Sequence, residues 1–312
     1  MRVNTRFRTI TAAFATVLAL TGATACSTGD DPGSSAGSTS AEHTDDISVG
    51  VQPDPAAVAL LPASAKAKGN LEVPMDLTSP PTTFMAADNK TPIGFNPDIA
   101  RLIAKKLGLG LQIDNVKFAT VIPGLQGGRY DFTASTMGPT ADRLKVLDMI
   151  DYFANGEGVL VPYGNPQHLS MDGMCGNNIA VQSGTTQEIH ELPDLSKANC
   201  ESKGKPAIKG VSLPSVNDAL TQVMSKRVDG VFYDSTSLSW AVAKEPKSFQ
   251  VLQPVLNTVP VALALNKNSP LTPAIQKAMQ SIIDSPKYAE ALNRWGFDGL
   301  GVKTASPSKA ED

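Results

Sequence analysis

The chain has 312 residues, a formal net charge of −3, three cysteines and three histidines. No basic patch with interleaved aromatic residues occurs, which argues against nucleic-acid binding. The cysteines and histidines form no cluster with metal-ligand spacing, so we expect no metal site and no cofactor. About 250 residues follow the N-terminal region, enough for two medium lobes or one large domain.

Residues 1–25 have the pattern of a secretory signal peptide. Arg2, Arg6 and Arg8 precede an apolar run, Ile10–Leu20 (ITAAFATVLAL), and small residues follow it. A membrane-spanning helix needs about 20 apolar residues, so we expect no permanent transmembrane segment. Cleavage removes three arginines and no acidic residue, which takes the net charge of the mature chain from −3 to −6.

The end of this segment, TGATAC, resembles a lipobox, where bacterial lipoproteins are cut before a cysteine that is then acylated. Ala23 stands where such sites usually have leucine, and ordinary cleavage near Ala25, giving a freely secreted protein, is the alternative. Residues 27–55 are rich in Ser, Gly, Thr, Asp and Pro and cannot bury enough apolar surface to fold. We predict lipidation of Cys26 and a disordered tether over residues 26–55 on the outer face of the cell membrane.

The two other cysteines are expected to pair with each other. If Cys26 takes lipid, Cys175 and Cys200 remain, and exported proteins commonly pair their cysteines. A Cys175–Cys200 disulfide closes a loop of about 25 residues and contributes roughly 3 kcal/mol by restricting the unfolded chain.

Strands and helices alternate along the rest of the chain, which predicts an α/β architecture. Asn96 is expected to cap the first long helix and Gly108 to end it, while Ser215 caps a later helix whose apolar face includes Met224. The predicted strands are Asn70–Met75, Leu111–Val116, Tyr130–Ala134, Ile179–Gln182, Val228–Tyr233 and Val259–Leu265. The predicted helices are Pro97–Leu107, Thr120–Gln126, a helix ending at Glu191, the helix after Ser215, and two near the C-terminus around Ile275–Ile283 and Tyr288–Trp295.

Four stretches in register resemble the polar amino-acid branch of ABC-transporter solute-binding proteins, bacterial extracellular solute-binding protein family 3. The longest is GFNPDIARLIAKKLGLGLQIDNVKFATVIPGLQGGRYDFTASTMGPTADRLK, residues 94–145. The others are IAVQSGTTQE (179–188), RVDGVFYD (227–234) and RWGF (294–297). Together they cover essentially the whole chain after the tether.

The resemblance implies the two-lobed type II periplasmic binding protein fold, in which two crossing hinge strands join the lobes. We place lobe one at residues 56–161 plus 255–302, lobe two at 162–254 and a disordered tail at 303–312. The implied function is the substrate-binding component of an ABC importer, which captures an amino acid or close analogue by cleft closure and delivers it to the permease subunits. We expect the protein to act as a monomer.

The charged candidates for ligand binding follow from this resemblance. A buried amino-acid zwitterion needs a partner for each charge, because an unpaired buried charge costs several kcal/mol. Arg143 matches the carboxylate-binding arginine of the family, and its planar fork suits a carboxylate; by local sequence alone it would be a surface arginine. Asp234 matches the ammonium-binding aspartate, with a helix N-cap as the alternative. Asp76 matches a second acidic site residue, with an ordinary turn aspartate as the alternative.

The neutral candidates lie in two turns. Gly184, Thr185 and Thr186 mark the change from strand to helix, where backbone N–H groups suit a carboxylate; a routine glycine turn with a threonine cap is the alternative. Thr136 and Gly138, in the turn before Arg143, are expected to supply backbone contacts.

The pocket for the ligand side chain is less defined. Phe118 matches an apolar wall position, and a plain core residue is its alternative. Ser79 stands where many relatives have an aromatic residue that covers the ligand, and Gly138 replaces a hydroxyl residue. These substitutions predict an open pocket and do not name the amino acid.

Two other classes of function are alternatives for this chain. Some proteins of this fold are cyclohexadienyl or arogenate dehydratases, which need a general acid or base in the cleft. Neither His168 nor His190 matches a ligand position, so we expect no catalytic residue and no enzyme activity. A ligand-sensing protein would resemble this chain closely, but no transmembrane segment or output domain supports that interpretation.

Overall fold

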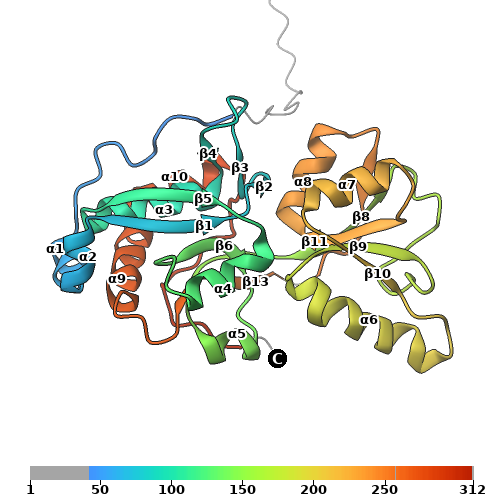
Figure 1. Cartoon of the computed structure of the whole chain (residues 1–312). Helices are drawn as coiled ribbons and strands as arrows, with labels where there is room; N and C mark the ends of the chain where they lie inside the picture. Colours follow the sequence, from blue (N-terminus) through green and yellow to red (C-terminus); the bar gives the residue numbers. More distant parts are fainter. Residues whose placement is uncertain (1–41, 257, 311–312) are drawn as a thin grey trace, which may run out of the picture. The chain divides into compact units, whose positions relative to one another are not determined.

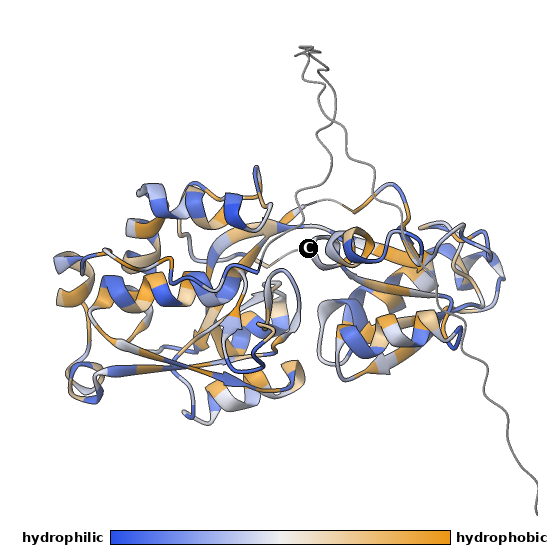
Figure 2. Cartoon of the chain, turned by 90° about the horizontal axis from the view of Figure 1, so that it is seen from above, coloured by the Kyte–Doolittle hydropathy of each residue, from blue (hydrophilic) through white to orange (hydrophobic). Residues whose placement is uncertain are grey.

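In the computed structural model, the described residues are 42–256 and 258–310 (Figure 1). The predicted signal peptide, Cys26 and most of the predicted tether lie outside them. The helices of both lobes present hydrophobic and hydrophilic residues in alternation along their turns (Figure 2). None of the helices in the described ranges is long and apolar enough to cross a membrane.

Lobe one is built on a parallel strand pair and a three-stranded antiparallel sheet. In the pair, β1 (Asn70–Met75) runs beside β5 (Gly110–Asn115). In the sheet, the central strand β13 (Val259–Asn266) pairs with β6 (Thr133–Met137) on one side and β7 (Leu147–Asn155) on the other. Three short strands also form a small sheet: β2 (Thr78–Ser79), β3 (Thr83–Met85) and β4 (Pro92–Ile93). The helical segments of this lobe are α1 (Pro55–Ala59), α2 (Ala63–Lys68), α3 (Phe95–Leu107), η1 (Phe118–Thr120), α4 (Val121–Gln126), α5 (Ala141–Val146), α9 (Thr272–Ile283) and α10 (Pro286–Arg294).

Helix α3 shows why the predicted cap was wrong. The capping residue is Gly94, at φ +122°, where a Cβ would lie 2.5 Å from the carbonyl oxygen of Thr82. The helix therefore begins at Phe95, and Asn96 lies inside its first turn, fully buried. The C-terminal stop is confirmed: Gly108 takes the left-handed conformation at φ +67°.

Lobe two contains a five-stranded sheet in the order β10 (Lys209–Leu213), β9 (Asn178–Gln182), β11 (Gly230–Asp234), β8 (Glu157–Pro162), β12 (Phe249–Val251). The helical segments around it are η2 (Gln187–Glu191), α6 (Leu192–Asn199), η3 (Glu201–Lys203), α7 (Val216–Met224) and α8 (Ser235–Lys244). Cys175 and Cys200 lie side by side in this lobe, with their Cα atoms 5.5 Å apart.

Two neighbouring segments connect the lobes. Strand β7 ends at Asn155 and β8 begins at Glu157, so the first crossover lies at Gly156. The returning segment runs beside it, since the N–H of Leu256 donates to the Glu157 carbonyl over 2.8 Å and Val259 pairs with Asn155. Strand β8 therefore belongs to the sheet of lobe two, although the sequence led us to place residues 157–161 in lobe one. Its apolar run suits a central, two-sided position in a sheet.

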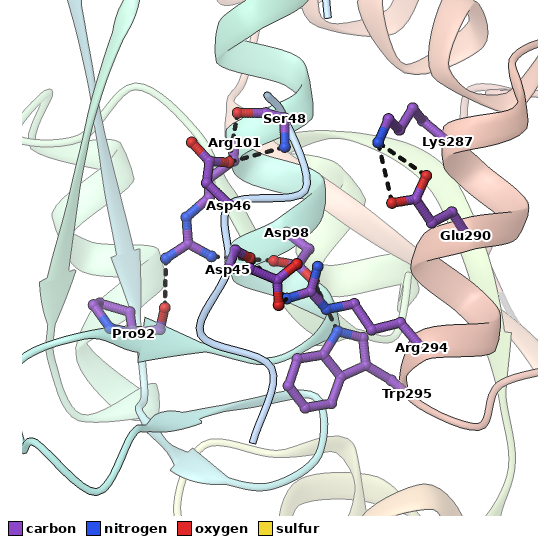
Figure 3. A network of polar contacts seen from close by, with 10 residues as sticks. All are labelled: Asp45, Asp46, Ser48, Pro92, Asp98, Arg101, Lys287, Glu290, Arg294 and Trp295. Carbon is purple, nitrogen blue, oxygen red and sulfur yellow. Dashed lines mark hydrogen bonds and ion pairs between the residues drawn. The ribbon is translucent and has the colours of Figure 1, made fainter. Parts of the chain in front are cut away.

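Both ends of the described chain differ from the expected disorder. We call residues 42–51 the N-terminal strap: Ile47 is 2% exposed, and Arg294 donates to the carboxylate of Asp45 over 2.8 Å (Figure 3). At the other end, Ala305 is buried and Pro307 forms a β-bridge with Ile150 of β7. The prediction of disorder from composition was wrong here, because a single buried side chain can hold a polar segment against a larger lobe.

Among the other elements, some predicted bounds are confirmed and others differ from the structure. The bounds of β1 and the Ser215 cap of α7 are confirmed. Strand β6 begins three residues later than predicted, because the Asp131 carboxylate accepts the N–H of Glu72 and holds the preceding residues as a turn. Helical structure after β9 continues past Glu191 to Asn199, and Met224 is 60% exposed rather than part of an apolar face.

Candidate functional site

A partly enclosed cavity lies where both crossover segments meet the ends of β6, β9 and β11. Its volume is about 30 Å³, room for about two water molecules. The lining residues are Phe118, Ser135, Thr136, Gly138, Arg143, Asn155, Gly156, Glu157, Thr185, Thr186, Gln187, Tyr233, Asp234, Val259 and Val261.

Arg143 reaches this cavity from α5. Thr140 caps that helix by accepting the N–H of Arg143 over 3.2 Å, and the arginine side chain turns inward, leaving the residue 7% exposed. Its guanidinium donates to the carbonyl oxygens of Gly138 and Gly184, each over 2.9 Å. It also lies 5.9 Å from the centroid of the Phe118 ring, within reach of a cation–π contact. The first hydrogen bond stays within lobe one, and the second joins lobe one to lobe two.

Thr136 lies at the end of β6 in a conformation that β-branched residues avoid, with φ +50°. Its N–H donates to the hydroxyl of Tyr152 over 2.9 Å, and that hydroxyl donates to Asn96 over 2.6 Å. The Asn96 amide then donates to the Thr136 hydroxyl over 3.1 Å. Asn96, expected to be a helix cap, instead holds this strained turn at the cavity.

Asp234 lies at the end of β11, directly before α8. It occupies the N-cap position of α8, as the alternative interpretation expected, but its side chain makes no capping hydrogen bond to that helix. Instead it accepts from Nε2 of Gln187 over 3.1 Å, and the same nitrogen donates to the carboxylate of Glu157 over 2.7 Å. Desolvation by burial, and then the negative charge of Glu191, raise the pKa of Asp234 to about 7. The positive charge of Arg143 lowers the pKa of Asp234 and so partly offsets this rise.

Asn155 adds a further polar group at the first crossover. The residue is 3% exposed and lines the cavity beside Glu157. Its buried Oδ1 has no hydrogen-bond partner among residues 42–256 and 258–310. Since buried acceptors are normally satisfied, this oxygen is a position at which a ligand N–H would be stabilised.

The turn after β9 was expected to offer backbone N–H groups to a ligand carboxylate, but the N–H of Gly184 is already bonded. The Gly184 N–H donates to the carboxylate of Glu188 over 2.6 Å, so this donor is already used by a side chain of the same segment. The Thr185 hydroxyl donates to the Gln182 carbonyl over 2.7 Å, which fixes the turn. Thr185 and Thr186 line the cavity, whereas Gly184 contributes only its carbonyl to Arg143.

Asp76 and Ser79 do not line the cavity; they join the lobes next to it. The Asp76 carboxylate accepts from Nε2 of Gln182 over 2.8 Å and from the Phe118 N–H over 3.1 Å. The Ser79 and Tyr233 hydroxyls lie 3.0 Å apart, and Tyr233 donates to Gln182 over 2.7 Å. Burial raises the pKa of Asp76 and places that of Tyr233 well above its usual range.

The cavity thus brings together Phe118, Thr136, Gly138, Arg143, Thr185, Thr186 and Asp234 from the predicted set. Sequence reasoning missed three lining residues with a charged or amide side chain: Asn155, Glu157 and Gln187. Gln187 was within reach, since it directly follows the predicted threonines. The other two lie at the first crossover, which the sequence placed several residues too late. No group of three metal-ligating acids, histidines or cysteines occurs in the described part of the chain.

Two α/β lobes, two adjacent crossovers and a polar cavity between the lobes define a two-lobed ligand-binding protein with the type II periplasmic fold. Residues 71–298 match the protein family described as "Bacterial extracellular solute-binding proteins, family 3". The chain belongs to this family.

Similar proteins carry names for two kinds of ligand. The arginine-binding protein ArgT of Corynebacterium glutamicum is 27% identical over 246 residues, which cover 79% of this chain and 80% of that protein. The glutamine-binding protein GlnH of Bacillus subtilis is 28% identical over 208 residues, covering 65% and 72%. Among solved structures, an ancestral arginine-binding protein bound to arginine matches with a TM-score of 0.67 and 28% identity, covering 73% of this chain and 98% of that one. An ancestral arginine-binding protein bound to glutamine matches with a TM-score of 0.67 and 27% identity, covering 74% and 99%.

Proposed function

We propose that this chain captures an amino acid or a close analogue in the cavity between its lobes and delivers it to the membrane subunits of an ABC importer. The observation that carries the proposal is the pair of opposite charges on the cavity wall: Arg143 from lobe one and Asp234 from lobe two. The names of the relatives, all binding proteins rather than enzymes, support the same role.

Arg143 and Asp234 have complementary tasks in this proposal. The Arg143 guanidinium has five N–H donors, and a ligand carboxylate takes the place of the Gly184 carbonyl at its Nη2. The Asp234 carboxylate accepts the α-ammonium group. Thr136, Thr185 and Thr186 complete the polar wall, and Phe118 with Gly138 shapes the space beside the carboxylate.

Ligand binding is coupled to closure because its contacts come from both lobes. A ligand that touches both lobes binds the closed form better than the open form and shifts the population towards closure. The pairs Asp76–Gln182 and Ser79–Tyr233 stabilise the closed arrangement next to the cavity. The importer then recognises the closed, monomeric protein.

The protein is placed outside the cytoplasm in this proposal. Residues 1–25 direct export, and a lipid on Cys26 holds the mature chain on the outer face of the membrane. Labelling with a fatty-acid analogue should mark the wild type and leave Cys26→Ser unlabelled; equal labelling of both contradicts the anchor. We also propose that Cys175 and Cys200 form a disulfide there, since their Cα atoms are 5.5 Å apart. Thiol titration before and after reduction, in denaturant, tests it.

Isothermal titration calorimetry with a panel of amino acids tests the binding role. At least one amino acid should bind, and Arg143→Ala should weaken that binding by about 2–5 kcal/mol, because a buried carboxylate loses its cation. Arg227→Ala is the matched control, since Arg227 is exposed and is not among the residues that line the cavity. Unchanged affinity in Arg143→Ala, or no binding of any amino acid by the wild type, contradicts the proposal.

A further inference from the structure

Trp240 belongs to lobe two by its place in α8, but its side chain packs against lobe one. Leu238 and Ala241 of the same helix face the core of lobe two. The half-buried Trp240 side chain instead joins the hydrophobic core of lobe one. Its ring centroid lies 5.8 Å from that of Phe84 on β3, within the range of favourable aromatic pairs. In Figure 1, α8 is the helix of lobe two beside the small sheet β2–β3–β4.

Phe84 is held in place from the side of lobe one. It is buried on β3, the middle strand of the small sheet. The Trp295 ring meets it edge-on at 5.7 Å, and the Trp295 indole N–H donates to the buried Asp98 carboxylate over 2.8 Å. His43 of the N-terminal strap contacts Trp295 edge-on at 5.3 Å. The two tryptophans of the chain therefore both contact Phe84, one from each lobe.

The contact between Phe84 and Trp240 lies outside the ligand cavity. Neither residue is among those that line the cavity, so neither is expected to touch a bound ligand. Separation of the lobes would expose both rings to water, and burial of aromatic surface stabilises the arrangement in which they meet. Lys244, one turn after Trp240, places its ammonium group 4.9 Å from the indole centroid, a cation–π contact that helps to fix the orientation of the ring.

We infer that Phe84 and Trp240 form an aromatic latch, a contact away from the ligand that stabilises the closed arrangement of the lobes. The inference rests on the proposed function, in which ligand binding is coupled to closure. A contact made only in the closed arrangement raises the population of that arrangement, and with it the apparent affinity, without touching the ligand. The latch adds an apolar contribution to the polar contacts that join the lobes next to the cavity.

A double-mutant cycle tests the latch, because it separates the contact from what each substitution does within its own lobe. Phe84→Leu and Trp240→Leu are made singly and together in the full chain. Two quantities are measured: the affinity for the tightest-binding amino acid, by calorimetry, and the urea midpoint of the ligand-free chain. Coupling appears in the affinity if the ligand-free lobes are apart, and in the midpoint if they are already together.

Trp240→Leu should have a larger effect when Phe84 is present than in the Phe84→Leu background. The difference should be about two- to tenfold in affinity, the range expected for an aromatic pair, or a correspondingly larger fall in the urea midpoint. Tyr163→Leu is the matched control from lobe two, since Tyr163 is 65% exposed and lies outside the cavity lining. Its effects should be the same in both backgrounds.

The outcomes separate the latch from the proposed function. Equal effects of Trp240→Leu in the two backgrounds, in both quantities, overturn the latch and leave the proposed function intact. Failure of every amino acid to bind the wild type overturns the proposed function, and the latch with it. Should a leucine variant fail to fold, methionine replaces leucine in the same cycle, because its flexible side chain fills irregular spaces.

Discussion

Gly184→Ala separates backbone strain from lobe closure in a single substitution. Gly184 lies at φ +83°, so an alanine there is strained whether the lobes are open or closed. Its new Cβ would also lie 2.9 Å from Cα of Ala119, which belongs to lobe one. That second contact exists only when the lobes are together.

The two effects have different sizes and appear in different measurements. The left-handed conformation costs an alanine about 1–2 kcal/mol, and this should lower the free energy of unfolding. The overlap with Ala119 is relieved when the lobes separate by a few tenths of an ångström, so it raises the free energy of the closed form. Because ligand binding is coupled to closure, a rise of about 1.4 kcal/mol should reduce ligand affinity about tenfold.

Urea denaturation of the ligand-free chain measures the first effect, and calorimetry with the tightest-binding amino acid measures the second. Gly138→Ala is the matched comparison from the opposite wall, because its Cβ would meet the Thr186 methyl group at 3.5 Å, an ordinary contact. It should change both quantities less than Gly184→Ala does. If the two variants bind ligand equally well, Gly184 is not a closure contact and the reasoning fails.

Three further outcomes are expected. The unfolded pKa of Asp234 is about 4 and the folded pKa about 7, so its contribution to stability is complete below about pH 4 and is lost as the pH rises to about 7. Asp234→Asn should flatten the fall in unfolding free energy between about pH 4 and pH 7, and an unchanged slope contradicts the shift. Tyr152→Phe leaves the N–H of Thr136 without its acceptor and should cost about 1–3 kcal/mol by urea denaturation, whereas Tyr163→Phe, 65% exposed, should cost nothing measurable. Ile47→Ala should lower the free energy of unfolding by about 2–4 kcal/mol; no loss would mean that the N-terminal strap does not pack on lobe one in solution.

Local signals were enough for most of the fold. Strand β1 and helix α7 were predicted closely because an apolar run or a capping serine lies within the element itself. Gly108 was predicted because a single residue type suits the left-handed end of a helix. The family motifs then placed Arg143 and Asp234, which share one cavity although 91 positions separate them in the chain.

The parts that could not be predicted depend on contacts between distant segments. Asparagine is a residue type that commonly caps helices, so the sequence suggested that role for Asn96. Its hydrogen bonds to Tyr152 and Thr136 depend on how distant segments pack together. Glu157 has no local feature that marks it, because its place in the site follows from where the chain crosses between sheets. The N-terminal strap shows the same limit, since its polar composition hides the one side chain, Ile47, that lobe one buries.

The position of Glu157, one residue beyond Gly156, matters for any opening of the lobes. Atoms beside a rotation axis move least, so a rotation about the crossovers would displace this carboxylate less than the wall residues that lie farther out along either lobe.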